Sequence, residues 1–290
     1  KENRLLASGN ILLTPFPELK FKSTLTLDRR NAVNTTFLDP ISTAWGRNQY
    51  GEASDNRNMN TVLTFDNVLT YNKNFKKHGL EVMAGSSWTD SDYSNSWING
   101  SHYRSDQIQT LNAANKISWD NTGTGASQWG IMSFFGRVAY NFDSKYLVTA
   151  NLRADGSSKL HPDHRWGVFP SFSAAWRISS EKFMENLTWI DDLKLRGGWG
   201  QTGNSGGATD LSVAGLSLEN VKYSFYGNGQ GMGMWNGMTF ATGYFAGLVD
   251  TNLKWETNEQ MNIGIDASFL QGDLNLTMDY FIRKSKDLLL

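Results

Sequence analysis

The stretch Gln260–Arg283, QMNIGIDASFLQGDLNLTMDYFIR, holds two runs of alternating residues separated by a short turn at Gln271–Gly272. In the first run, the odd positions from 261 to 269 are apolar and the even positions are polar or glycine. In the second run, the even positions from 274 to 282 are apolar, and most of the odd positions are polar. Strict alternation of this length predicts two strands that each have one apolar and one wet face.

The same period of two recurs along most of the chain. Many of the runs reach ten residues or more, which is longer than the ~5–6 residues typical of soluble sheets. They match instead the ~9–11 tilted residues with which a strand crosses a bilayer. The ten predicted strands lie near residues 3–13, 18–28, 60–72, 79–89, 131–142, 146–155, 166–178, 192–200, 256–269 and 273–284.

Composition removes several classes of protein. The 290 residues include no cysteine, which excludes disulfides, thiolate-bound metals and a thiol nucleophile. Lys and Arg total 27 against 28 Asp and Glu, so the charge gives no basis for binding nucleic acid. No apolar run approaches the ~20 residues of a membrane-spanning helix, whereas a transmembrane β-barrel leaves a much weaker hydropathy signal.

The connections between the predicted strands alternate in length. Short turns are predicted at residues 14–17, 74–78, 143–145 and 271–272, and residues 179–191 occupy a short-turn position with a helical pattern. Long or medium polar loops are predicted at 29–59, 90–130, 156–165 and 201–255. Aromatic residues cluster near the predicted strand ends, as in the aromatic girdles of membrane barrels. These features favour an all-β, antiparallel transmembrane β-barrel over a soluble β-sandwich.

Several longer stretches resemble the TonB-linked outer-membrane transporters of the SusC/RagA type. The resemblance is strongest from Phe135 to Asn204, through FGRVAYNFDSKYLVTANLRADGSSK, RWGVFPSFSAAWRISSEKFM and LKLRGGWGQTGN. It continues in NLKWETNEQMNIGIDASF at 252–269 and LTMDYFIRKSKDLLL at 276–290. A third match is NVLTYNKNFKKHGLEVMAGSS at 67–87, and a fourth, weaker match is ILLTPFPELKFKSTLTLD at 11–28. The long loops are not covered.

The resemblance implies a 22-stranded barrel in a Gram-negative, Bacteroidetes-like outer membrane, closed by an N-terminal plug. It further implies uptake of a glycan, oligosaccharide or peptide, driven by TonB and assisted by a SusD-like surface lipoprotein. Ten strands cannot complete such a barrel. We therefore expect residues 1–290 to be a segment of the barrel domain, with the plug domain and the TonB box outside this chain.

No catalytic, cofactor-binding or metal-binding constellation is evident in the sequence. His161 and Asp163 lie in a predicted loop without a convergent third ligand. Ser205, in GNSGG, lacks the histidine context of a serine protease, and the glycine-rich run at 227–237 lacks the Lys-Ser/Thr of a phosphate loop. We interpret Asp191 and Asp192 as carboxylates that close a turn rather than as an acid–base pair. We therefore expect no enzymatic activity.

Two groups of residues are candidates for binding. Exposed rings in long loops can stack on sugars or pack on the lipoprotein partner. These loop aromatics are Trp45, Trp97, Tyr103, Trp235 and Tyr244. The polar strand faces would line a wet lumen if the strands close into a barrel. Their candidate lumen-facing residues are Arg137, Arg153, Arg177, Arg196, Gln260, Asp266 and Asp279.

Two other functions remain open from the sequence. A non-transporting outer-membrane barrel or adhesin would share the strand pattern but would need neither plug nor TonB. A soluble β-sandwich carbohydrate-binding module would share the alternation, and its polar faces would meet bulk water.

Overall fold

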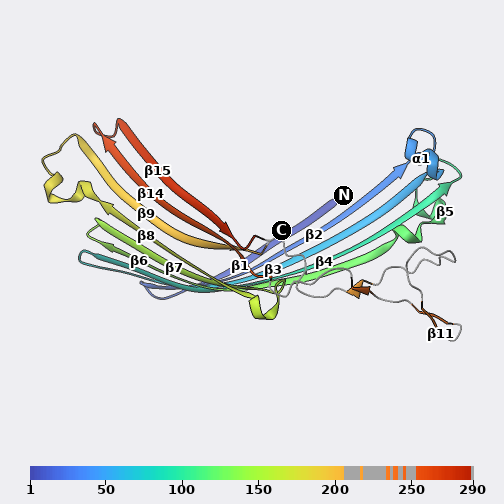
Figure 1. Ribbon diagram of the computed structural model, residues 1–290, viewed down its shortest axis with the longest axis horizontal. Helices are drawn as coiled ribbons and strands as arrows, with labels where there is room; N and C mark the ends of the chain where they lie inside the picture. Colours follow the sequence, from blue (N-terminus) through green and yellow to red (C-terminus); the bar gives the residue numbers. More distant parts are fainter. Residues whose placement is uncertain (206–215, 218–232, 236–237, 241–243, 246–252, 289–290) are drawn as a thin grey trace.

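A computed structural model describes residues 1–205, 216–217, 233–235, 238–240, 244–245 and 253–288. One curved antiparallel sheet makes up most of it (Figure 1). Ten strands follow one another across this sheet in chain order. They are β1 (Glu2–Phe16), β2 (Leu19–Leu38), β3 (Glu52–Phe75), β4 (His78–Tyr103), β6 (Gly123–Phe142), β7 (Tyr146–Ser157), β8 (Trp166–Arg177), β9 (Ile190–Asn204), β14 (Glu256–Phe269) and β15 (Leu274–Lys286).

All ten predicted strands are present, and each pairs with its predecessor in an antiparallel register. The eleventh strand of the sheet, β5 (Ala114–Ile117), pairs with the end of β4. Within the described residues, no second sheet packs against the ten-strand path, so the β-sandwich alternative is wrong. The path is open between β1 and β15 in the part of the chain that the structure describes.

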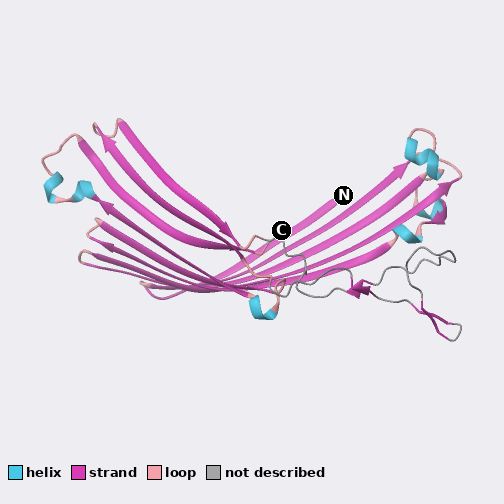
Figure 2. Cartoon of the chain, in the orientation of Figure 1, coloured by secondary structure: helices cyan, strands magenta, loops and turns pink. Residues whose placement is uncertain are grey.

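The remaining elements are short and lie in the connections (Figure 2). None of the described helices is long and apolar enough to cross a membrane. These elements are α1 (Ala44–Gln49), the 3₁₀ helices η1 (Leu111–Ala113), η2 (Trp119–Asn121), η3 (Pro162–His164), η4 (Ile178–Ser180) and η5 (Lys182–Met184), and the strand pairs β10 (Leu216–Ser217) with β13 (Tyr244–Phe245) and β11 (Gly233–Trp235) with β12 (Met238–Phe240).

Connections of different length lie at opposite ends of the strands. The β1–β2, β3–β4, β6–β7, β8–β9 and β14–β15 connections form the short-turn end, at the left of Figure 1. The β2–β3, β4–β6, β7–β8 and β9–β14 connections form the opposite, long-loop end. This segregation confirms the predicted meander and is the arrangement of outer-membrane barrels, whose short turns are periplasmic.

The strand register divides the sheet into an apolar face and a polar face. Paired residues in neighbouring strands lie on the same face, so a row can be followed across the sheet. One row of the apolar face contains Leu19, Tyr71, Val82, Val138, Ala150, Phe172, Trp199, Met261 and Ile282. The apolar positions that alternate in the sequence therefore come together on one side of the sheet.

No protein layer covers this apolar face in the described residues. Val138 and Ile265 are 45% and 44% exposed, although each lies inside a long strand, four residues before its end. Only six described apolar side chains are buried, so the sheet does not depend on a hydrophobic core of its own. A face of this kind is stable next to lipid chains, because the solvent there is itself apolar.

Two of the predicted long loops are present but shorter than predicted, because the strands extend into both of their ends. Residues 29–38 and 52–59 belong to β2 and β3, and residues 90–103 and 123–130 belong to β4 and β6. At ~3.3 Å per residue, the 26 residues of β4 far exceed a ~25 Å apolar band. Beyond that band both faces of the sheet meet water, so pairing continues without the alternation that identified the strands.

The helix predicted at 179–191 is wrong. The segment forms the 3₁₀ turns η4 and η5, and Phe183 is 64% exposed rather than packed on a helix face. Glu181 lies between the two turns. Its carboxylate accepts hydrogen bonds from the Tyr146 hydroxyl (2.6 Å), the Trp176 indole (3.2 Å) and the Lys145 ammonium (3.3 Å). The connection thus ties together two aromatic residues of the apolar face at the short-turn end.

Arginine at Val138 or Ile265 should prevent assembly of the barrel, whereas Gln260→Arg should be tolerated. The first two changes place a charge on the lipid side at a cost of about 2–4 kcal/mol, and the third places it on the wet side. Folding can be measured by the shift in gel mobility between unheated and boiled outer-membrane fractions. Equal loss of the folded band in all three variants would contradict this assignment of faces.

Glu181→Gln should lower the unfolding temperature at neutral pH. Hydrogen bonds from Tyr146, then Trp176, hold the pKa of Glu181 below its ordinary value of 4.5. A lowered pKa in the folded state stabilises the fold above pH 4.5 and loses that contribution as the pH falls further. The difference in unfolding temperature between the two proteins in detergent should therefore shrink as the pH falls below 4.5. A difference that stayed constant across this range would show that the ionised carboxylate is not responsible.

Candidate functional site

The register places all seven candidate lumen residues on the polar face. Arg137 shares a row with Gln260, through Asn151, Ser171 and Gly200. Arg177 and Asp266 share another row through Lys194. Arg153, Arg196 and Asp279 occupy the same side of their strands. Which of these residues meet a plug or a substrate stays a prediction.

The densest charge cluster lies on β9, β14 and β15. Arg196 donates to both oxygens of Asp266 at 3.1 and 3.3 Å and to Asp279 at 2.8 Å. Lys194 adds a second cation 3.0 Å from Asp266. Arg196 and Asp279 lie on opposite sides of β14, and the residue between them in the row is Gly264.

Gly264 leaves the space through which Arg196 reaches Asp279. A Cβ atom at position 264 would lie 2.5 Å from Asp279 Oδ1 and 2.8 Å from Arg196 Cζ. Any other residue would have to displace one member of the ion pair. The glycine is therefore part of the charge network, although it has no side chain.

The other charged candidates are also paired within the wall. Arg153 donates through Nε to Asp155 at 2.8 Å and through Nη2 to Ser133 at 3.0 Å. Arg137 lies 3.8 Å from Glu81, and Arg177 lies 3.5 Å from Asp192. The Gln260 side-chain oxygen accepts from Arg283 at 3.1 Å. These contacts keep the polar face nearly neutral while leaving it wet.

Trp45 lies at the long-loop end, as predicted. It is in the short helix α1, is 58% exposed, and its indole donates to Glu52. Trp235 and Tyr244 fall in the short strands β11 and β13, and their side chains lie outside what the structure describes.

Trp97 and Tyr103 are not loop residues, which corrects the prediction. Trp97 lies within β4 on the polar face, in register with Asn56 and Gly123. Tyr103 ends β4 and is only 6% exposed, with its ring 5.1 Å from that of Phe37 and its hydroxyl donating to the Thr110 carbonyl at 3.2 Å. It is a packing residue in this structure, so it offers little surface to a ligand.

A small apolar cluster on this side of the sheet was missed. Leu160, Phe169 and Trp255 are buried together, and the rings of Phe169 and Trp255 meet edge to face at 5.5 Å. Phe169 pairs with Arg153 and therefore lies on the polar face, not in an aromatic girdle. The Trp255 indole donates to the Arg165 carbonyl at 2.8 Å, which joins the β7–β8 connection to the start of β14. The position of Phe169 near a strand end does not indicate which face of the sheet its ring occupies.

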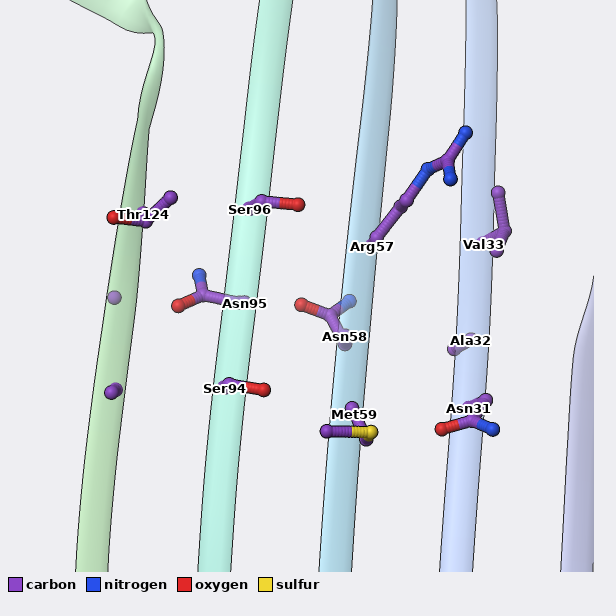
Figure 3. A pocket seen from close by; sticks show the side chains of 12 residues that line it. Asn31, Ala32, Val33, Arg57, Asn58, Met59, Ser94, Asn95, Ser96 and Thr124 are labelled. Carbon is purple, nitrogen blue, oxygen red and sulfur yellow. The ribbon is translucent and has the colours of Figure 1, made fainter.

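Several hollows lie near the long-loop ends of β2, β3 and β4, and two of them border the same strand segments. The first, of ≈ 630 Å³, is drawn in Figure 3, and most of its side chains, among them Arg57, Met59 and Ser96, lie on the apolar side of the register. The second, of ≈ 410 Å³, lies on the polar face beside Arg30, Asn58, Asn60 and Tyr93. Among the described residues, no group of three or more His, Asp or Glu side chains is placed to bind a metal.

Gly264→Leu should separate Arg196 from Asp279 and lower the free energy of unfolding by about 1–3 kcal/mol, the usual cost of overpacking. Gly197→Ala is a matched control, because a Cβ atom there would have no neighbour closer than 3.6 Å. Urea titration of the folded barrel in detergent measures both. A Gly264→Leu protein as stable as the control would show that this gap has no structural role.

The family model described as TonB dependent receptor-like, beta-barrel matches residues 10–290. TonB-dependent receptor P39 of Formosa agariphila is 35% identical over 94% of this chain and 25% of its own length. TonB-dependent receptor SusC of Bacteroides thetaiotaomicron is 29% identical over 94% of this chain and 26% of its own. The chain thus spans about a quarter of these relatives.

Solved structures agree in fold. The structure of the RagAB peptide importer in its closed-closed state superimposes with a TM-score of 0.83 and 21% identity, over 99% of this chain and 30% of that one. The ferric citrate transporter FecA gives a TM-score of 0.55 at 10% identity, over 98% of this chain and 34% of that one. The expected fold is confirmed: the chain belongs to the TonB-dependent receptor family and forms part of its β-barrel in the bacterial outer membrane.

Proposed function

We propose that the protein containing this chain imports a large nutrient, a glycan or a peptide, in a TonB-dependent manner. The observation that carries the proposal is the division of the sheet into two faces. An uncovered apolar face meets lipid, and an ion-paired polar face would line a lumen wide enough for a plug and a large solute. Family membership supplies the link to TonB.

The pairing of charges within the wall supports passage rather than permanent closure. Arg196, Asp266 and Asp279 satisfy one another without any group from outside the sheet. If the plug left the lumen, no charge on this part of the wall would lose its partner. Displacing the plug would therefore not carry the free-energy cost of an unpaired charge here. TonB would bind the plug side of the protein, outside this chain, and supply the force.

A SusD-like lipoprotein is the partner that we propose for the long-loop end. The similarity to SusC and to the RagAB importer supports this choice, because the resemblance to SusC/RagA-type transporters implies a SusD-like lipoprotein. The strand extensions of β2, β3 and β4 and the helix α1 would give it a broad rim on which to rest. We propose no chemical conversion of the nutrient by this segment.

Growth on a single polymeric nutrient tests this function. Deleting the gene that carries this chain should abolish growth on its nutrient, while growth on a monosaccharide or amino acids remains normal. Deleting tonB should have the same effect. Deleting the gene of the proposed lipoprotein partner should reduce uptake at limiting nutrient concentration.

Uptake that persisted without TonB would contradict the proposal. A non-transporting barrel or adhesin would then be the better assignment, and loss of adhesion rather than growth would be the relevant phenotype.

A further inference from the structure

Asparagine residues dominate the polar face of the β3 and β4 extensions. Three successive rows of the register pair Asn56 with Trp97, Asn58 with Asn95, and Asn60 with Tyr93. Asn34 continues the first row onto β2. We call Asn56, Asn58, Asn60, Tyr93, Asn95 and Trp97 the asparagine patch. It lies between the apolar band and the long-loop end, where both faces of the sheet meet water.

Trp97 lies across its neighbouring strand because that strand has a glycine at the matching position. A Cβ atom on Gly123 would lie 2.9 Å from Trp97 Cζ2 and 3.3 Å from Cε2, so one side of the indole rests on the Gly123 backbone. Trp97 remains partly exposed. The indole therefore forms a fixed ledge on the polar face.

Two of the four amides of the patch accept hydrogen bonds within the wall, and the other two are available for a ligand. The hydroxyl of Tyr93 donates to Asn58 at 3.1 Å, and Ser91 donates to Asn60 at 3.3 Å. Among the described residues, the side chains of Asn56 and Asn95 have no hydrogen-bonding partner. Gly125 faces Asn95 in the register and leaves room for its amide. Figure 3 labels Asn58 and Asn95 at the same level of β3 and β4.

The patch carries no formal charge of its own. The nearest charged groups on this face of β1 and β2, Glu2 and Arg30, pair with each other at 2.7 Å. The ≈ 410 Å³ hollow on the polar face borders the patch through Asn58, Asn60 and Tyr93. Uncharged amides beside an aromatic ledge match a ligand that has many hydroxyls and an apolar ring face.

We propose that the asparagine patch is a glycan-binding site, in which Trp97 stacks on a sugar ring and Asn56, Asn58 and Asn95 bind its hydroxyls. The proposal rests on the proposed transport function and names the substrate class of the same lumen. Neighbouring strands are ~4.8 Å apart, about the width of a sugar ring, so residues of one row can contact the same ring, and successive rows on this face, ~6.7 Å apart along the strand, can contact successive parts of the chain. A peptide would gain less from the patch, because none of the six patch residues carries a formal charge, and the charged residues Lys1, Glu2 and Arg30 line only the adjoining hollow.

Binding should be measured by calorimetry on the detergent-solubilised full-length protein with its lipoprotein. The probes are six hexasaccharides, namely α-1,4-glucan, β-1,3-glucan, β-1,4-mannan, β-1,4-xylan, α-1,6-mannan and β-2,6-fructan, and a tryptic peptide mixture. We expect at least one hexasaccharide to bind, and Trp97→Ala to weaken it at least tenfold. Asn95→Ala should weaken the same ligand about threefold, in line with loss of one hydrogen bond.

Matched variants distinguish a loss of sugar affinity caused by losing the indole surface from one caused by a general folding defect. Trp97→Phe keeps an aromatic face and should retain most of the affinity. Gly123→Val keeps the tryptophan but displaces it, and should bind as weakly as Trp97→Ala. Ile98→Ala alters the next residue of β4, on the opposite face, and should bind normally. Gel mobility before and after boiling establishes that each variant is folded.

Three results would overturn the proposal: binding of the peptides but of no sugar, binding of none of the hexasaccharides, or unchanged sugar affinity in folded Trp97→Ala. Each of these is compatible with TonB-dependent growth, which is scored separately in the same strains. Loss of TonB dependence with sugar binding intact would instead reject the transport function and leave the site standing.

Discussion

The need to pair every backbone amide and carbonyl inside a bilayer governs this structure. Lipid offers no hydrogen bonds, so strands that cross it must form an uninterrupted ladder with their neighbours. The ten-strand path from β1 to β15 is such a ladder. In such a ladder, side chains alternate between lipid and water. Irregular backbone structure is possible only at the two ends of the strands, where water can bind the unpaired groups.

This constraint explains what could be predicted from the sequence. In β14 and β15, residues 261–269 and 274–282 lie within the apolar band, so one face must be apolar, and the alternation marks the strands directly. Residues 92–98 of β4 pair just as regularly, but both of their faces meet water. The periodicity disappears there while the ladder continues, so the sequence pattern places Trp97 in the β4–β6 loop, although the strand extends beyond it to Tyr103. The strand end at Phe169 likewise gave no sign of which face its ring would take.

Glycines explain a second limit of sequence reasoning. Gly264 and Gly123 are unremarkable in the sequence, yet each lies opposite a large side chain in the register. One opens the space for Arg196 to reach Asp279, and the other supports the indole of Trp97. Both roles depend on which residues pair across strands, and that information is absent until the sheet is built.

The length of the β3 and β4 extensions restricts how this wall can evolve. Side chains alternate with a period of two. Losing or gaining one residue inside either strand would therefore move every inward-facing side chain to the outer face, from that point to the nearest bulge or turn. Lineages can therefore remodel the mouth freely by point substitution, or by changing strand length in steps of two. Single-residue insertions and deletions should be confined to the rim, around α1 and the β4–β6 connection.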